Sequence, residues 1–285
     1  MDVPSHVPHL SNEILARIIE FLEGDLESLK ACSVTCHSFL YPARKHIFHH
    51  VHITIRNCAK FLQFLDANTN LGVHVRELHI VASNPMEQEV TWVDKYLPLL
   101  APKLPNVVHL ELKGKDRYKS APFRGFQSVK RLTIERTQVN NLNDFCALTG
   151  MFPRLEETWC HDLFVYRILT DEVTAEAYNP PRNLRITHFS DCRLDPAQYV
   201  DWMVKHDLYR NLEHFSSCPL QQVGLPAVGK IAKAAGPALK WWKLAMVGMV
   251  TQGGFVAADW IRTRTSKQSS SAPPHNTQIY TDLMT

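Results

Sequence analysis

The chain has 285 residues, of which 45% are hydrophobic, 21% charged and 9% aromatic. This composition is typical of a folded globular protein and excludes a mostly disordered chain, a collagen-like chain and a disulfide miniprotein. The 31 basic residues exceed the 28 acidic residues by only three, so we expect no nucleic acid as the main partner.

The first fifty residues predict three short helices. Ser11 can cap the first helix and Gly24 can end it, and its apolar residues are Ile14, Leu15, Ile18, Ile19 and Leu22. Asp25 can cap a second helix that carries Leu26, Leu29 and Cys32. A third helix carries Phe39, Leu40, Ile47 and Phe48, and Pro42 predicts a bend or a restart within it. Three such helices have more apolar surface than they can bury together, which favours either a cap on a larger domain or a docking module.

Residues 10–48 of this segment, LSNEILARIIEFLEGDLESLKACSVTCHSFLYPARKHIF, resemble an F-box. The positions that match the family pattern are Leu10, Glu13, Ile14, Leu15, Ile18, Leu22, Asp25, Leu26, Leu29, Val34, Cys36 and Phe39. The stretch LKACSVTCHSFLYPARKHIF is similar to the F-box families of mushroom-forming fungi. Family members usually have proline at the position of Ser11, where serine can cap the helix instead.

The resemblance implies that residues 1–50 form a three-helix F-box that docks on a Skp-type adaptor, which is held in turn by a cullin-RING ligase. The residues expected to contact the adaptor are Leu10, Ser11, Ile14, Leu15, Ile18, Val34, Cys36 and Phe39. The chain would then be a substrate-recognition subunit of a ubiquitin ligase. The alternative is a non-catalytic scaffold that binds the adaptor or other proteins and has no role in ubiquitin transfer.

An apolar pattern of the form L-x-x-L-x-L recurs between residues 48 and 244, every 22 to 32 residues. This spacing is close to that of leucine-rich repeats, so residues 51–262 predict an irregular, leucine-rich-repeat-like solenoid within the α/β class. Helices are expected between the repeats, at 57–68, 87–100, 140–152, 196–208 and 225–235. Thr158, Thr187 and Ser217 occupy leucine positions of the pattern, and an irregular α/β domain without repeats is the alternative.

Side chains alternate along a strand, so the neighbours of the buried repeat residues should line the open inner side of the solenoid. Among them we expect a target protein to contact His79, His109, Glu111, Arg131, Trp159, His161, His188, His214 and Trp241. Ser216 should be exposed on the same side. Because this side is rich in histidine, partner binding should change between about pH 7.5 and 5.5, as imidazoles titrate near 6.5.

No motif of a catalytic site stands out, so we expect no enzyme and no cofactor. Cys32 and Cys36 fall at positions of the helical core, which favours packing over metal binding. His46, His49, His50 and His52 form a dense cluster, in which His46, His49 and His50 would share a metal-binding face only on a continuous helix. Phe48 and Val51 instead indicate a helix that passes into a strand, so we expect no metal site.

The cysteine count, the N-terminal sequence and the C-terminal segments give expectations for localisation and order. Seven cysteines, an odd number, and the absence of a secretory signal favour the cytoplasm or nucleus. The apolar stretch 244–261 contains several polar residues, so we expect no membrane span. Residues 263–285 are rich in serine, proline and threonine and predict a disordered tail.

Overall fold

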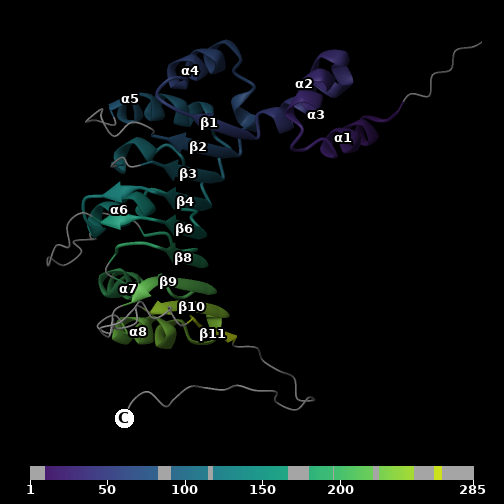
Figure 1. Ribbon diagram of the computed structural model, residues 1–285. Coiled ribbons are helices and arrows are strands. Elements are labelled where there is room, and N and C mark those ends of the chain that lie inside the picture. Colours follow the sequence, from purple (N-terminus) through teal and green to yellow (C-terminus); the bar gives the residue numbers. More distant parts are fainter. Residues whose placement is uncertain are drawn as a thin grey trace, which may run out of the picture.

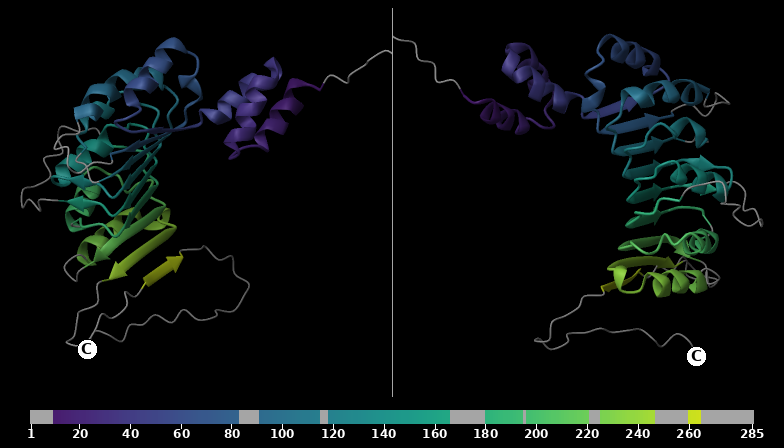
Figure 2. Two further views of the ribbon diagram at one scale, coloured as in Figure 1. Left: turned by 45° about the horizontal axis from the view of Figure 1, so that its top comes forward. Right: turned by 180° about the vertical axis from the view of Figure 1, so that it is seen from behind.

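A computed structural model of the protein describes residues 10–82, 91–114, 118–165, 180–194, 196–220, 225–246 and 260–264. Three helices at the N-terminus, α1 (Asn12–Glu20), α2 (Leu26–Thr35) and α3 (His37–Ile47), form what we call the helical unit. The helical unit is followed by a stack of strands and helices, from whose N-terminal end it projects (Figures 1 and 2).

The predicted helix caps of the helical unit are confirmed. The Ile14 amide donates to Ser11 Oγ at 3.5 Å, and the Ser28 amide donates to Asp25 Oδ1 at 3.1 Å. Gly24 has a φ of 96°, a conformation that glycine adopts without steric cost, and it ends the turn between α1 and α2.

The core of the helical unit is small. It consists of Ile19, Leu29 and Ala43, against which Leu22, Cys32, Phe39 and Ile47 pack. Two of the predicted adaptor contacts are therefore not fully open in this structure: Phe39 is half-buried against this core, and Leu15 is buried. The predicted packing of Cys32 is confirmed, whereas Cys36 is exposed at the junction of α2 and α3.

Pro42 does not interrupt α3, although the sequence predicted a bend or restart there. Proline inside a helix removes one backbone hydrogen bond. Phe39, Ala43 and Ile47 nevertheless recur at intervals of four residues and contact the core on both sides of Pro42. This shared face keeps α3 a single helix.

The stack is built on a nine-stranded sheet whose strands lie side by side in chain order. The strands are β1 (His50–Ile53), β2 (Glu77–Val81), β3 (His109–Lys113), β4 (Arg131–Glu135), β6 (Glu157–His161), β8 (Ile186–Ser190), β9 (His214–Leu220), β10 (Trp241–Met246) and β11 (Trp260–Arg264). All neighbours pair in parallel except β10 and β11, which are antiparallel. Two short strands, β5 (Gln138–Val139) and β7 (Phe164–Val165), form a second sheet.

The helices of the stack cover one face of the sheet (Figure 1). They are α4 (Cys58–Ala67), α5 (Thr91–Leu100), α6 (Leu142–Gly150), α7 (Pro196–Lys205) and α8 (Leu225–Ala235), and each lies in a segment where the sequence predicted a helix. The shortest repeat, between β3 and β4, has no α-helix among its described residues, only the 3-10 helix η3 (Ala121–Phe123). A parallel sheet in chain order with a helix in most connections is a leucine-rich-repeat-like solenoid, not an irregular α/β domain.

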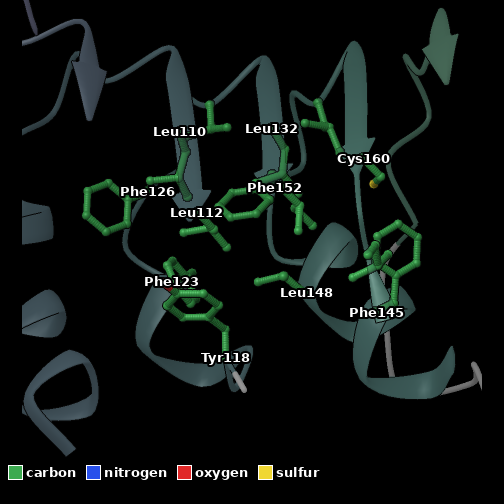
Figure 3. Packing of buried hydrophobic residues seen from close by; sticks show 14 of the residues in the cluster. Leu110, Leu112, Tyr118, Phe123, Phe126, Leu132, Phe145, Leu148, Phe152 and Cys160 are labelled. Atoms are coloured by element: carbon green, nitrogen blue, oxygen red, sulfur yellow. The ribbon is translucent and has the colours of Figure 1, made fainter. Parts of the chain in front are cut away.

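The core of the solenoid lies between the sheet and these helices. Leu110 and Leu112 of β3, Leu132 of β4 and Cys160 of β6 point toward a row of aromatic side chains (Figure 3). This row includes Phe123, Phe126, Phe145 and Phe152. Along each of β2, β3, β6 and β8, buried and half-buried residues alternate. Thr158, Thr187 and Ser217 are buried at the leucine positions of the repeat, as predicted.

The C-terminal boundary of the fold differs from the sequence-based prediction. The polar run from Thr263 predicted the start of a disordered tail, but β11 continues to Arg264 because its residues pair with the free edge of β10, Trp241 with Arg264 and Trp242 with Thr263. The rest of the predicted tail, residues 265–285, lies outside the described residues.

Thr158 provides a test of the core. Its Oγ1 is buried and has no hydrogen-bond partner in the part of the chain that the structure describes, and an unsatisfied buried hydroxyl costs about 1–3 kcal/mol. Thr158→Val should therefore raise the free energy of unfolding by about 1 kcal/mol, measured by urea denaturation. The matched variant Thr133→Val removes a hydroxyl that lies 2.9 Å from His109 Nε2 and should give no gain. A loss of stability in Thr158→Val would contradict this assignment of the core.

Candidate functional site

The helical unit exposes a stripe of apolar side chains along α1. Ile14, Ile18 and Phe21 follow one another at helical spacing, with exposed fractions of 49%, 43% and 89%. Leu10, just before the helix, is 45% exposed. We call Leu10, Ile14, Ile18 and Phe21 the α1 stripe. It is the kind of surface that a protein partner covers, because isolated globular proteins rarely leave contiguous apolar patches open.

Other predicted adaptor contacts extend the exposed surface of the helical unit. Val34, near the end of α2, is 84% exposed, and Ser11 and Cys36 are exposed as well. Tyr41 of α3 and Phe21 are exposed but were not among the predicted contacts. Phe21 could have been found from the sequence, because it lies seven residues after Ile14 and three after Ile18.

The helical unit meets the solenoid at a pocket of about 440 Å³ between α3 and the 3-10 helix η1 (Gly72–His74). The rings of Tyr41 and His74, which both line this pocket, pack edge to face with 5.3 Å between their centroids. Burial lowers the pKa of His74, and the positive charges of Arg44 and Arg76 lower it further. His74 is therefore an uncharged packing residue near neutral pH.

The second candidate surface is the face of the sheet opposite the helices, which we call the inner face. Parallel strands in register place equivalent side chains next to one another, in rows across the sheet. One row runs His50, Glu77, His109, Arg131, Glu157, Ile186, His214 and Trp241. A second row runs His52, His79, Glu111, Thr133, Trp159, His188, Ser216 and Lys243.

The middle of the inner face carries a platform centred on Trp159. Glu157 Oε2 accepts hydrogen bonds from Trp159 Nε1 at 3.1 Å and from Arg131 Nε at 2.7 Å. The rings of Trp159 and His188 lie 4.9 Å apart with an angle of 33° between their planes. This network holds the indole in place, so its surface can receive a partner side chain with little loss of conformational entropy.

The C-terminal end of the inner face carries a second pair of aromatic rings, His214 and Trp241. The rings of His214 and Trp241 lie 5.9 Å apart at 37°. Beside them, Glu213 accepts from Arg185 Nε at 2.9 Å and from Lys240 Nζ at 2.8 Å. The pKa of Glu213 is lowered, chiefly by the hydrogen bond from Lys240 and also by Arg185.

All nine predicted target contacts lie on the inner face, and the structure brings them together in three groups: His79, His109 and Glu111; Arg131, Trp159, His161 and His188; His214 and Trp241. Ser216 was expected to be exposed but is buried. Its small side chain lies between its longer register neighbours His188 and Lys243.

His50 and His52 also belong to the inner face, although the prediction of target contacts omitted them. They alternate with the buried Val51 and Ile53 on β1. His50 pairs in register with Glu77, and His52 pairs with His79. The alternation rule that predicted the other strands would have placed both histidines here, but the predicted target contacts were taken only from the later strands.

Three inner-face histidines, His79, His109 and His188, have pKa values below the ordinary value for histidine. Burial lowers the pKa of His188, and the nearby His161 and Lys243 lower it further. Burial also lowers the pKa values of His79 and His109, although Glu111 beside His79 and Glu77 beside His109 act in the opposite direction. These three imidazoles therefore take up protons at pH values below about 6.5, the ordinary pKa of histidine.

No protein family matches this sequence, and no curated protein matches it. Among solved structures, an internalin from Listeria monocytogenes matches with a TM-score of 0.37 and 12% identity, over 70% of this chain and 62% of that one. Internalin C2 from the same organism matches with a TM-score of 0.28 and 14% identity, over 59% and 84% of the two chains. Both TM-scores are low, so the solenoid is assigned from its own topology and repeat spacing.

Two further structural findings concern chemistry and membranes. Burial raises the pKa of the Cys58 thiol to about 11 and that of Cys146 well above its usual value, so both are packing residues. None of the described helices is both long enough and apolar enough to cross a membrane.

The histidine assignment predicts how stability depends on pH. Since the pKa of His188 in the folded protein lies below the unfolded value of about 6.5, the unfolded chain binds more protons at acidic pH. The free energy of unfolding should therefore be highest above pH 6.5 and fall as the pH drops through the folded pKa. NMR titration of the imidazoles, with His188→Gln for assignment, should give a midpoint below 6.5. A midpoint at or above 6.5 would show that His188 is not desolvated.

Proposed function

We propose that the chain is an F-box substrate-recognition subunit of a Skp-cullin-F-box ubiquitin ligase. The observation that supports this most strongly is the α1 stripe, an uncovered apolar surface on a helical unit that projects from the solenoid (Figure 2). The F-box-like residues 10–48 coincide with this unit. The structure itself identifies no partner, so the adaptor is inferred from the sequence resemblance.

In this proposal the α1 stripe and Val34 are the adaptor-facing residues, and Leu15 and Phe39 support them from beneath. Complete burial of one such aliphatic side chain contributes about 1.5–3 kcal/mol. Four or five of them can therefore dominate an interface of ordinary size, about 800 Å² on each partner. Ser11 fixes the start of α1 and thereby the orientation of the stripe.

The inner face of the solenoid would bind the target protein. Trp159 and Trp241 are the proposed anchors, because partly exposed tryptophans held by polar neighbours are typical of interface hot spots. His161, His188 and Arg131 around Trp159 would add polar contacts that define specificity.

The mechanism needs no catalytic group on this chain. An adaptor complex that carries a ubiquitin-charged enzyme would be held at the helical unit, and the target would be held on the solenoid. Tethering both to one chain raises the effective concentration of the target's lysines near the reactive thioester. The rate gain would come from proximity and orientation alone.

The adaptor contact can be tested with charged substitutions in the α1 stripe. Leu10→Asp combined with Ile14→Asp should reduce binding of the full chain to a purified Skp-type adaptor at least a hundredfold, because two carboxylates would be buried in an apolar interface. Binding is measured by pull-down and by calorimetry. Circular dichroism should show that the variant remains folded.

The matched control is Leu99→Asp. Leu99 on α5 is 51% exposed, close to the values of Leu10 and Ile14, but lies on the solenoid. It should leave adaptor binding unchanged. Unchanged binding in the α1 variant would contradict the F-box assignment. Binding of the adaptor without co-purification of a cullin would instead favour the scaffold alternative.

The target surface predicts a separate outcome. Trp159→Ala should weaken capture of target proteins cross-linked to the full chain while ligase activity is blocked, by about 30-fold if Trp159 contributes about 2 kcal/mol. Phe64→Ala is the control, since Phe64 is an exposed aromatic residue on α4, outside the inner face. Quantitative mass spectrometry compares the captured proteins. Equal losses in both variants would remove the assignment of Trp159 as an anchor.

A further inference from the structure

The N-terminal end of the inner face gathers histidines around one carboxylate. Glu77 and His79 lie on β2, His109 lies on β3, and His50 lies on β1. Glu77 pairs in register with His50 on one side and with His109 on the other. His79, two residues after Glu77, points to the same side of the sheet. Residues separated by up to about sixty positions in the chain therefore meet at one place.

The distances between the side-chain atoms are somewhat longer than those of an occupied zinc site. Glu77 Oε2 lies 3.4 Å from His109 Nδ1 and 3.7 Å from His79 Nε2, and the three residues each offer one ligand atom within 4.8 Å of the other two. Bonds of about 2.0–2.1 Å to a tetrahedral zinc ion separate two ligand atoms by about 3.3–3.4 Å. Small side-chain rotations would bring the three atoms onto a common ion.

The second nitrogen of each histidine already has a neighbour that can orient the ring. His109 Nε2 lies 2.9 Å from Thr133 Oγ1, and His79 Nδ1 lies 3.5 Å from Glu111 Oε2. Such outer contacts are characteristic of histidine ligands, because they fix the ring orientation and direct the other nitrogen toward the metal. His79 Nε2 is directed in this way, is buried, and has no hydrogen-bond partner among the described residues.

The protonation states also suit a metal. Burial lowers the pKa values of His79 and His109, so both are neutral near pH 7 despite the nearby carboxylates. Burial alone would raise the pKa of Glu77, but His50 and His109 lower it overall, so Glu77 is ionised. Two neutral imidazoles and a carboxylate form the set that coordinates zinc in sites with an open fourth position.

We propose that Glu77, His79 and His109 bind a zinc ion on the inner face, with the fourth coordination position open to water or to a side chain of a bound partner. The side chains of His79 and His109 are each 17% exposed and that of Glu77 is 26% exposed, so the ion would be partly shielded from solvent. The ion would join β2 to β3 at the end of the solenoid nearest the helical unit (Figure 1).

A neighbouring set, His49, His50 and Glu77, is less suited to the ion. The side chain of His50 is 51% exposed, so an ion held there would be more open to water than one held by His79 and His109. From the sequence no metal was predicted among His46, His49, His50 and His52, because a helix that passes into a strand separates their side chains. The pairing of the strands instead adds Glu77 and His109, which no local motif connects to His79.

The test is a zinc titration of the full chain, after removal of any affinity tag, in competition with a chromophoric chelator at pH 7.5. We expect one zinc ion per chain with a Kd of about 1 μM or lower. His79→Gln and His109→Gln should each weaken binding at least tenfold. His188→Gln is the matched control, a half-buried inner-face histidine on β8, and should bind zinc as the unmodified chain does.

Two further measurements keep the result decisive. Co²⁺ should give the visible absorption of a four-coordinate site, which His109→Gln abolishes, while circular dichroism shows that this variant is folded. Zinc binding should weaken as the pH falls below 6.5, because the imidazoles take up protons. Equal affinity in the His79, His109 and His188 variants, or a loss confined to His49→Gln, would overturn the proposed ligand set. Adaptor binding should be unaffected by all of these variants, which separates this test from that of the proposed function.

Discussion

The structure depends on one constraint, the in-register pairing of parallel strands whose side chains alternate between two faces. In β3 this pairing directs Leu110 and Leu112 into the core and His109 and Glu111 to the inner face. A shift of one residue would exchange the two sets and bury the charges. The same constraint that stabilises the solenoid therefore also builds its polar surface, because successive repeats stack their outward residues into continuous rows.

The helical unit, in contrast, cannot bury all of its apolar side chains. Its core of Ile19, Leu29 and Ala43 is too small to cover all the apolar residues of three helices, so the α1 stripe remains open. A solenoid can extend its core with each repeat, whereas three short helices cannot. The solenoid thus covers its apolar core with its own helices, whereas the helical unit leaves an apolar surface that suits a partner. This difference supports the proposed adapter role.

Much of the solenoid could be predicted because its signal is periodic. The strands, the connecting helices and the buried Thr158, Thr187 and Ser217 all follow from one repeated spacing. Features that depend on neighbours distant in the chain were missed. Examples are the burial of Ser216 between His188 and Lys243, the pairing of β11 with β10, and the cluster around Glu77. In the helical unit, helical spacing predicted the apolar residues but could not tell that Leu15 and Phe39 face inward while Ile14 and Ile18 face outward.

The central claim is that the helical unit and the inner face serve different partners. Hydrogen–deuterium exchange of the full chain, with and without a purified Skp-type adaptor, tests this directly by mass spectrometry. The adaptor should slow amide exchange in peptides from residues 10–22 and around Val34, and leave the peptides of β2 to β6 unchanged. Protection confined to the inner-face strands, or none in the helical unit, would contradict the account.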